Sequence, residues 1–214
     1  MTAAQPALAA RDLRKSFTLP DGGRLVILQG VNLAVARGES AAVMGASGSG
    51  KTTLLHLLAG IEPADSGTVE TPAGRTGLVF QHHYLLPELD ARENVALGAR
   101  LAGGAKAAAF SRADELLAAV GLAPRARHLP AELSGGELAR VALARALAAE
   151  PAVILADEPT GNLDETTAGA VLDALFRVVR DAGAALVLVT HDPEVAARAD
   201  RVLRLEHGTL HSVR

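Results

Sequence analysis

The stretch GASGSGKT, residues 45–52, decides the fold of this 214-residue chain. It matches the pattern G-x-x-x-x-G-K-[ST], in which the backbone N–H groups of a glycine-rich loop surround phosphate oxygens. The residues before it, Ser40–Met44, are typical of a strand, and those after it carry apolar side chains at helical spacing as far as Gly60. A strand, this loop and a helix in that order predict a phosphate-binding site.

Two side chains of this loop have predicted roles. Lys51 is one of three lysines in the chain, and from its position it would reach the β- and γ-phosphates of a nucleotide. The Thr52 hydroxyl would bind Mg²⁺. The alternative is a glycine-rich turn with a solvated lysine, which we disfavour because the pattern lies between a strand and a helix. The predicted phosphate contacts are Gly45, Ala46, Ser47, Gly48, Ser49, Gly50, Lys51, Thr52 and Thr53.

Two acids end a second apolar run, VILADEP. Asp157 and Glu158 follow what is typical of a buried parallel strand, and ligands bind at the carboxyl ends of such strands. Because adjacent strand residues point to opposite sides, the two carboxylates are expected to differ in role. Asp157 would hold Mg²⁺ through water, and Glu158 would polarise the attacking water as a general base. A solvated pair of loop acids is the alternative.

Two further polar residues end apolar runs. Gln81 follows GLVF and could coordinate Mg²⁺ and the water through its amide oxygen. His191 follows LVLVT, where it would contact the γ-phosphate and hold Glu158 or the water in place. A histidine with a purely structural hydrogen bond is the alternative.

The stretch LSGGELARVALARAL, residues 133–147, allows two interpretations. In the first, Ser134 is a helix N-cap, Glu137 completes a capping box, and Gly135 and Gly136 are tolerated. In the second, the N–H groups at this helix start are left open for an anion.

Composition excludes several classes of protein. Hydrophobic residues make up 49% of the chain, which is enough for a substantial core, yet no apolar run has the length of a membrane span. The N-terminus lacks the pattern of a secretory signal. There are no cysteines, so disulfides, thiolate metal sites and cysteine nucleophiles are excluded. A formal charge of −3 gives no support for nucleic-acid binding.

The order of elements predicts an α/β fold with a mainly parallel sheet. A turn at Gly30 is expected to separate two strands, and a turn at Pro72-Ala73-Gly74 is expected between two short strands. From about Leu85 to Leu129 the pattern turns helical. A helix is expected from about Glu165 to Asp181, and a final hairpin through His207-Gly208.

Together these motifs resemble the nucleotide-binding subunits of ABC transporters over nearly the whole chain. The resemblance rests on GASGSGKT, Gln81, LSGGE, VILADE, the GNLD turn at 161–164 and His191, in the family's order. It implies a P-loop NTPase with a RecA-like, mainly parallel sheet, an antiparallel β subdomain and a helical insertion. The single domain 1–214 would then divide into a catalytic core with the β subdomain, 1–83 and 150–214, and a helical subdomain, 84–149.

The resemblance also implies ATP, Mg²⁺ and a dimer. Phe17 matches the aromatic residue that stacks on adenine, a core residue being the alternative. The ligand of LSGGE would be the γ-phosphate of ATP held by a second copy in a head-to-tail dimer, and Asp164 would communicate across that interface. The residues predicted to contact that phosphate are Ser134, Gly135, Gly136 and Glu137.

Finer features look like the branch that serves lipoprotein release, macrolide-type export and a cell-division permease. They are DEPTGNLD and FQHHYLLPELDARENV. The resemblance implies integral-membrane permease partners at the cytoplasmic face of the inner membrane and no nucleic acid. Tyr84, Leu85 and Leu86 are candidates for the permease contact, with packing inside the helical subdomain as the alternative. The adjacent His82 and His83 invite a metal site, but a partner surface is favoured.

Three features depart from the family's pattern. Glu137 stands where glutamine is usual, Leu138-Ala139 replace a polar, basic pair, and the segment before Gln81 is short. Other classes that contain similar motifs are a soluble ABC-type ATPase acting in DNA repair or translation and a regulatory nucleotide-binding module. The first would need coiled-coil insertions, zinc-binding cysteines or a second cassette, and the intact Glu158 and His191 argue against the second.

Overall fold

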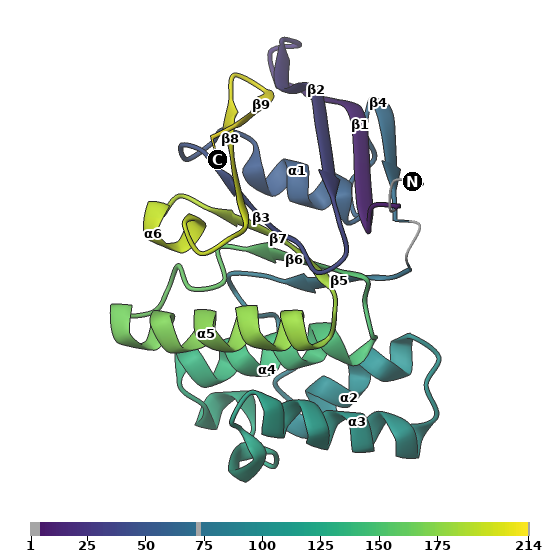
Figure 1. Cartoon of the computed structure of the whole chain (residues 1–214), viewed down its shortest axis with the longest axis vertical. Coiled ribbons are helices and arrows are strands. Elements are labelled where there is room, and N and C mark those ends of the chain that lie inside the picture. Colours follow the sequence, from purple (N-terminus) through teal and green to yellow (C-terminus); the bar gives the residue numbers. More distant parts are fainter. Residues whose placement is uncertain (1–4, 72–73, 214) are drawn as a thin grey trace.

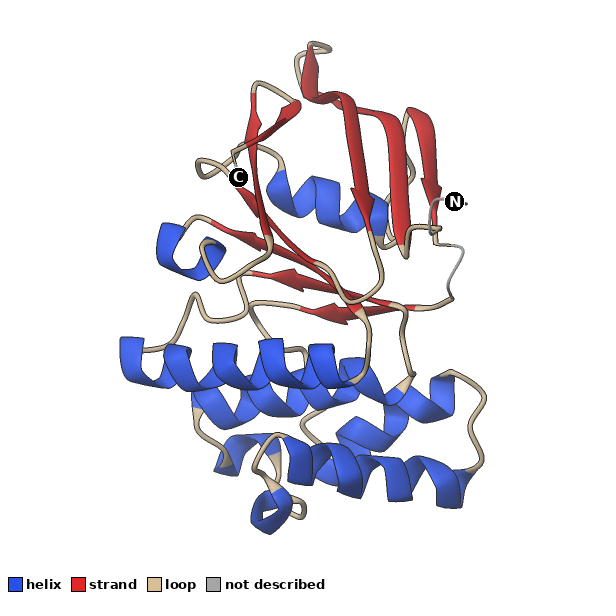
Figure 2. Ribbon diagram, in the orientation of Figure 1, coloured by secondary structure: helices blue, strands red, loops and turns tan. Residues whose placement is uncertain are grey.

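The computed structural model describes residues 5–71 and 74–213, which form two sheets and a layer of helices (Figures 1 and 2). A three-stranded sheet has the order β2-β1-β4, and a six-stranded sheet has the order β5-β6-β7-β3-β8-β9. The strands are β1 Leu8–Thr18, β2 Arg24–Val35, β3 Ser40–Met44, β4 Ser66–Glu70, β5 Thr76–Val79, β6 Val153–Asp157, β7 Ala185–Thr190, β8 Arg201–Glu206 and β9 Thr209–Ser212.

The six-stranded sheet is parallel except for β9, which pairs antiparallel with β8. Both of its faces are covered, so its central strands are apolar on both sides: all six residues of β7 are buried, as are the first four of β6. Because β3, β5, β6 and β7 run in one direction, their carboxyl ends meet at one edge. The predicted mainly parallel α/β sheet is confirmed.

The helices lie on both sides of this sheet. Their bounds are α1 Lys51–Leu58, α2 Ala91–Leu101, α3 Lys106–Ala119, α4 Gly135–Ala148, α5 Glu165–Asp181 and α6 Pro193–Ala196. Helix α1 lies between the two sheets, and its leucines share a core with both. Helices α4 and α5 cover the opposite face and share a second core with α2 and α3 (Figure 1). The antiparallel, parallel and helical layers that the resemblance implies are all present.

The predicted turn at Gly30 is wrong, because β2 continues through it. The pairing of β1 with β2 shifts there, from Leu13 opposite Val31 to Arg14 opposite Gln29, so Gly30 is the extra residue of a bulge. Its φ of 92° is accessible to glycine at little cost. Strand β1, which carries Phe17, had no sequence prediction.

The two strands predicted around residues 72–74 exist, but they do not form a hairpin. β4 pairs with β1 in the three-stranded sheet, whereas β5 pairs with β6 in the parallel sheet. Pro72 and Ala73 lie outside the described residues. The chain therefore leaves the three-stranded sheet after β4 and joins the parallel sheet at β5.

Other sequence predictions agree closely with the structure. The bounds of β3 and α5 are those predicted, and the final hairpin turns at His207 and Gly208, whose φ values of 48° and 76° suit a tight hairpin turn. The predicted helical region begins later than expected, since residues 85–90 precede the first helical residue, Ala91.

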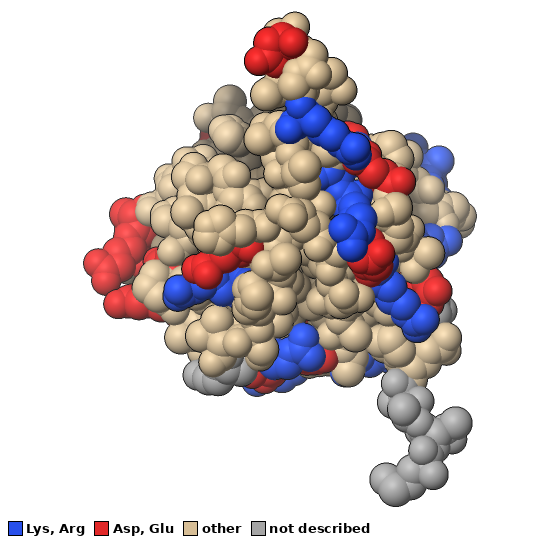
Figure 3. Space-filling view, turned by 90° about the horizontal axis from the view of Figure 1, so that it is seen from above, with Lys and Arg blue, Asp and Glu red and all other residues tan. Residues whose placement is uncertain are grey.

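Seen from the end that carries the three-stranded sheet, Lys and Arg side chains alternate with Asp and Glu (Figure 3). Ion pairs of residues on or next to the three-stranded sheet include Arg14 with Asp12 at 2.9 Å and Arg24 with Asp65 at 3.3 Å. Within residues 5–71 and 74–213, no helix is both long and apolar enough to cross a membrane.

Candidate nucleotide-binding site

The phosphate loop joins β3 to α1 and is packed closely against its neighbours. Gly48 and Gly50 have φ values of 76° and 98°, and Gly50 immediately precedes α1. A Cβ at Gly50 would lie 2.6 Å from Ile27 Cγ2, and one at Gly45 would lie 2.8 Å from the Leu205 carbonyl oxygen. Real Cβ atoms do not approach so closely, so glycine is required at both positions to bring the loop this near β2 and β8.

Lys51 is folded back over this loop. Its Nζ donates to the carbonyl oxygens of Gly45 at 2.8 Å and Ala46 at 2.9 Å, and the residue is buried. Within the described part of the chain, the buried Ser49 Oγ has no hydrogen-bond partner. The cavity beside the loop measures about 240 Å³. It is lined by Ile27, Ser47, Gly48, Gly50, Lys51, Thr52, Thr53 and Glu158.

Asp157 and Thr52 come together at the end of β6, where the Thr52 hydroxyl donates to the Asp157 carboxylate. Burial raises the pKa of Asp157, while this hydrogen bond and the charge of Lys51 act to lower it. Hydroxyl and carboxylate oxygens are ligand atoms that Mg²⁺ prefers, and here one of each lies beside a phosphate loop. The described residues contain no group of three or more histidine, cysteine or acidic side chains placed to hold a metal.

Glu158 has an unusual backbone that turns its side chain toward the loop cavity. Its φ of 40° is rare outside glycine, and its N–H donates to the Val189 carbonyl at 3.0 Å while its carbonyl accepts from Gly161 at 3.0 Å. Glu158 thus lies just after β6, not on it. His191 Nδ1 lies 3.1 Å from Glu158 Oε1, which brings this predicted pair together.

Gln81 lies beside the same carboxylate. A Cβ built on Gly161 would be 2.9 Å from Gln81 Nε2 and 3.3 Å from Glu158 Oε2, so the three residues are close neighbours. Gln81 Nε2 also donates to Asn162 Oδ1 at 3.4 Å. The structure therefore brings Thr52, Asp157, Glu158, His191 and Gln81 from four separate segments to one edge of the sheet.

The Ser134–Glu137 segment forms the capping box that the sequence allowed. Ser134 is the N-cap of α4, and one oxygen of Glu137 accepts from the Ser134 N–H at 2.8 Å and from its hydroxyl at 2.9 Å. Gly136 also has a packing role, because a Cβ there would lie 2.3 Å from Thr167 Cγ2 on α5. None of these residues lines the phosphate-loop cavity.

Two other predicted residues lie away from that cavity's wall. Phe17 is on β1 opposite Leu25 and is 40% exposed, with Lys15 Nζ 5.0 Å from the centre of its ring. It is therefore not a core residue. Asp164 is the N-cap of α5 and accepts from the Thr167 N–H at 3.0 Å, and its bonds to Thr167 lower the pKa of its carboxyl group.

Arg145, which no sequence pattern predicted as a functional residue, holds the segment that follows Gln81. Its guanidinium donates to the carbonyls of His83 at 2.6 Å and Tyr84 at 2.5 Å, and both residues have positive φ, 59° and 46°. An arginine in the otherwise apolar, alanine-rich second half of this helix, residues 141–148, was the only available signal. Burial lowers the pKa of Arg145.

The side chains of the segment that Arg145 holds differ in how far they are exposed. Tyr84 is 64% exposed and Leu86 is 42% exposed, whereas Leu85 packs against the core of the helical layer. Asn94 fixes the backbone of Leu86 by accepting its N–H at 2.8 Å and donating to its carbonyl at 3.0 Å. The chain thus presents Tyr84 and Leu86 outward on a rigid support.

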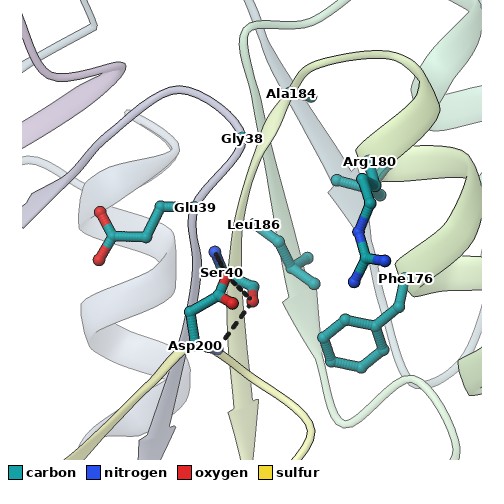
Figure 4. A pocket seen from close by; sticks show the side chains of 9 residues that line it. Gly38, Glu39, Ser40, Phe176, Arg180, Ala184, Leu186 and Asp200 are labelled. Atoms are coloured by element: carbon teal, nitrogen blue, oxygen red, sulfur yellow. Dashed lines mark hydrogen bonds between the residues drawn. The ribbon is translucent and has the colours of Figure 1, made fainter.

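The opposite edge of the sheet has a hollow of a different kind (Figure 4). It measures about 210 Å³, and Ser40 and Leu186, where β3 and β7 begin, are among its lining residues. There the Ser40 N–H and hydroxyl donate to Asp200 at 2.9 and 2.6 Å. No predicted site residue lines this hollow, so it is separate from the candidate site.

Comparisons with known proteins agree with this geometry. The family model for ABC transporters matches residues 28–161. The lipoprotein-releasing system ATP-binding protein LolD of Bordetella pertussis is 49% identical, with 96% of this chain and 95% of that protein covered. LolD of Legionella pneumophila is 45% identical, with 96% and 97% covered.

A solved structure has the same fold. It is a dimeric, post-hydrolysis state of the ATP-binding cassette MJ0796 bound to ADP and Pi, with a TM-score of 0.84 and 32% identity. The similarity covers 97% of this chain and 99% of that one.

Proposed function

The chain belongs to the ABC transporter family as one of its ATP-hydrolysing subunits, and we propose that the transporter it drives is a lipoprotein-releasing system. The observation that carries this proposal is the near full-length match to lipoprotein-releasing ATP-binding proteins at 45–49% identity. The exposed Tyr84 and Leu86 offer a surface for a membrane permease at the cytoplasmic face of the inner membrane. The core would comprise 1–83 and 150–214, and the helical subdomain 84–149.

ATP phosphates bind at the loop 45–52 and Thr53. The loop N–H groups and the start of α1 supply donors and partial positive charge. The Lys51 ammonium, already fixed over the loop by two carbonyls, neutralises the β- and γ-phosphates. Phe17 offers an exposed ring on which adenine stacks.

Mg²⁺ would be held by the Thr52 hydroxyl, the Gln81 amide oxygen and, through water, Asp157. When bound, the ion neutralises phosphate charge as it develops during transfer. The Thr52 to Asp157 hydrogen bond supports this assignment, because it places two oxygen atoms together at the loop.

Glu158 acts as the general base that orients and deprotonates the attacking water. Its carboxylate lines the loop cavity, and its strained backbone fixes the direction of the side chain. His191, 3.1 Å from one carboxylate oxygen, keeps Glu158 in place and contacts the γ-phosphate. Gln81, next to the other oxygen, positions the water.

A second copy completes each site. Ser134, Gly135, Gly136 and Glu137 contact the γ-phosphate held by the partner chain, and Asp164 carries the signal between copies. Their separation from the cavity within one chain supports this arrangement, as do the dimeric cassettes of the same fold.

The test is reconstitution of lipoprotein release. The chain is co-expressed with the membrane subunits of a lipoprotein-releasing system, and the purified complex is placed in proteoliposomes that contain an acylated lipoprotein. We expect ATP to drive release of that lipoprotein into solution with its acyl chains intact. Stable assembly with ATP turnover but no release, while a soluble or small-molecule cargo is moved, would contradict the proposal.

A further inference from the structure

The glutamate of the LSGGE segment carries a compensated charge. One of its oxygens accepts two hydrogen bonds from Ser134, and the other accepts from Arg125 Nε at 3.1 Å. The side chain is only 17% exposed. The Ser134 bonds, with a smaller contribution from Arg125, lower the pKa of Glu137, so the group is an anion at neutral pH.

A carboxylate at this position opposes the proposed function of the segment. The start of α4 is where the γ-phosphate of a second copy's ATP is to bind, and two anions at one helix end repel each other. The Ser134 hydroxyl donates to Glu137, although it is also a proposed donor to that phosphate. Glutamine, which is usual at this position in the family that the sequence resembles, is neutral and would not repel the phosphate.

Arg125 is fixed where it can relieve this repulsion. It ends the short 3-10 helix η1, Ala123–Arg125, and a second guanidinium nitrogen lies 3.0 Å from His128 Nε2. Since arginine can only donate, the histidine nitrogen is the acceptor of this contact, which fixes the guanidinium from a second side. Arg125 is still 47% exposed, so its positive charge faces both the carboxylate and the molecular surface.

We propose that Arg125 is a positioning residue of the LSGGE half-site: it neutralises Glu137 and so allows a charged glutamate to face a phosphate held by a second copy. This inference rests on the proposed function, in which that half-site acts on the partner chain's nucleotide. Arg125 is not among the residues that line the cavity beside the loop proposed to hold the chain's own nucleotide.

The first experiment measures dimer formation of Arg125→Gln by sedimentation equilibrium, with Mg²⁺ and a non-hydrolysable ATP analogue. We expect the dimer to be about tenfold weaker than for the unaltered chain, since a like-charge contact is left uncompensated. Arg127→Gln is the matched control. It removes the same charge two residues away, from an arginine whose partner is Asp90. Arg125→Lys, which keeps the charge, should retain most of the dimer affinity.

The second experiment separates charge from structure. Adding Glu137→Gln to Arg125→Gln removes the charge that Arg125 neutralises, so dimer affinity should return to within about threefold of the unaltered chain. If Arg125 only shaped the segment around it, the double variant would remain as weak as the single one.

Two other outcomes would separate failure of the role of Arg125 from failure of the proposed function. Unchanged dimerisation in Arg125→Gln, or no restoration by Glu137→Gln, overturns the role of Arg125 and leaves the proposed function intact. An unaltered chain that remains a monomer with the analogue at saturation overturns the partner-chain arrangement and this inference with it.

Discussion

The two halves of the proposed ATP site are built in different ways. The half around the phosphate loop collects side chains from four separate segments at the carboxyl edge of the parallel sheet. The half around Ser134 lies at the start of a single helix and is stabilised by bonds within four residues and by the bond from Arg125 to Glu137. The first half depends on the whole sheet, whereas the second depends on local capping and on α4 packing against α5.

The largest expected effect tests the sheet-edge half. Glu158→Gln keeps the size of the side chain but cannot accept a proton from water, so hydrolysis should fall by at least about 100-fold. ATP binding should persist, and the ATP-bound dimer should accumulate. Phosphate release and gel filtration with ATP measure the two effects. Normal turnover by a chain that stays monomeric would contradict the base assignment.

The next effect tests the helix-start half through its packing. Gly136→Ala places a Cβ 2.3 Å from Thr167 Cγ2, so either the Thr167 side chain or the spacing of α4 and α5 must change. We expect the free energy of unfolding to fall by about 2 kcal/mol, a typical cost of overpacking. Gly169→Ala, on an open face of α5, is the matched control. It should stabilise by about 0.5 kcal/mol through helix propensity. Urea unfolding measures both changes.

These two halves also differ in how far the sequence could predict them. The loop at 45–52 and the capping box at 134–137 are contiguous, so their patterns showed both directly. The approach of His191 and Gln81 to Glu158 followed from one rule, that the carboxyl ends of parallel strands meet at one edge. Their predicted roles followed from the same positions, since each residue ends an apolar run.

Long-range pairing was harder to predict. Nothing in residues 66–81 shows that β4 joins one sheet and β5 the other, because pairing partners are far apart in the chain. Gly30 has the composition signal of a turn, but its opposing strand makes it a bulge. Arg145 bonds to carbonyls 61 and 62 residues away, which no local pattern records.

A smaller effect distinguishes capping from phosphate binding at Ser134. Ser134→Ala should lower hydrolysis about tenfold, and it should also lower stability by about 1 kcal/mol through loss of the cap. Ser134→Gly also lacks the hydroxyl, but glycine as an N-cap costs only a few tenths of a kcal/mol and adds no charge beside Glu137. We therefore expect Gly to recover most of the melting temperature without restoring hydrolysis. Full activity in the Gly variant would leave Ser134 with a capping role alone.

The smallest expected effect concerns the segment that connects the two halves. Arg145 lies on the same helix as the LSGGE start, yet its guanidinium holds the carbonyls of His83 and Tyr84, just after Gln81. Arg145→Lys keeps the charge but loses the planar pair of donors, so one carbonyl is left unpaired, at a cost of about 1 kcal/mol. Arg177→Lys is the control, because Arg177 donates to one carbonyl, Ala119, which lysine can also reach.

Hydrogen exchange locates the consequence of that change. The positive φ values of His83 and Tyr84 are costly and persist because Arg145 fixes both carbonyls. In Arg145→Lys we therefore expect faster exchange at residues 82–86, with little change in the phosphate loop. Equal exchange in both lysine variants would mean that Asn94 alone is sufficient to hold this segment, and that α4 does not link the LSGGE start to Gln81 through Arg145.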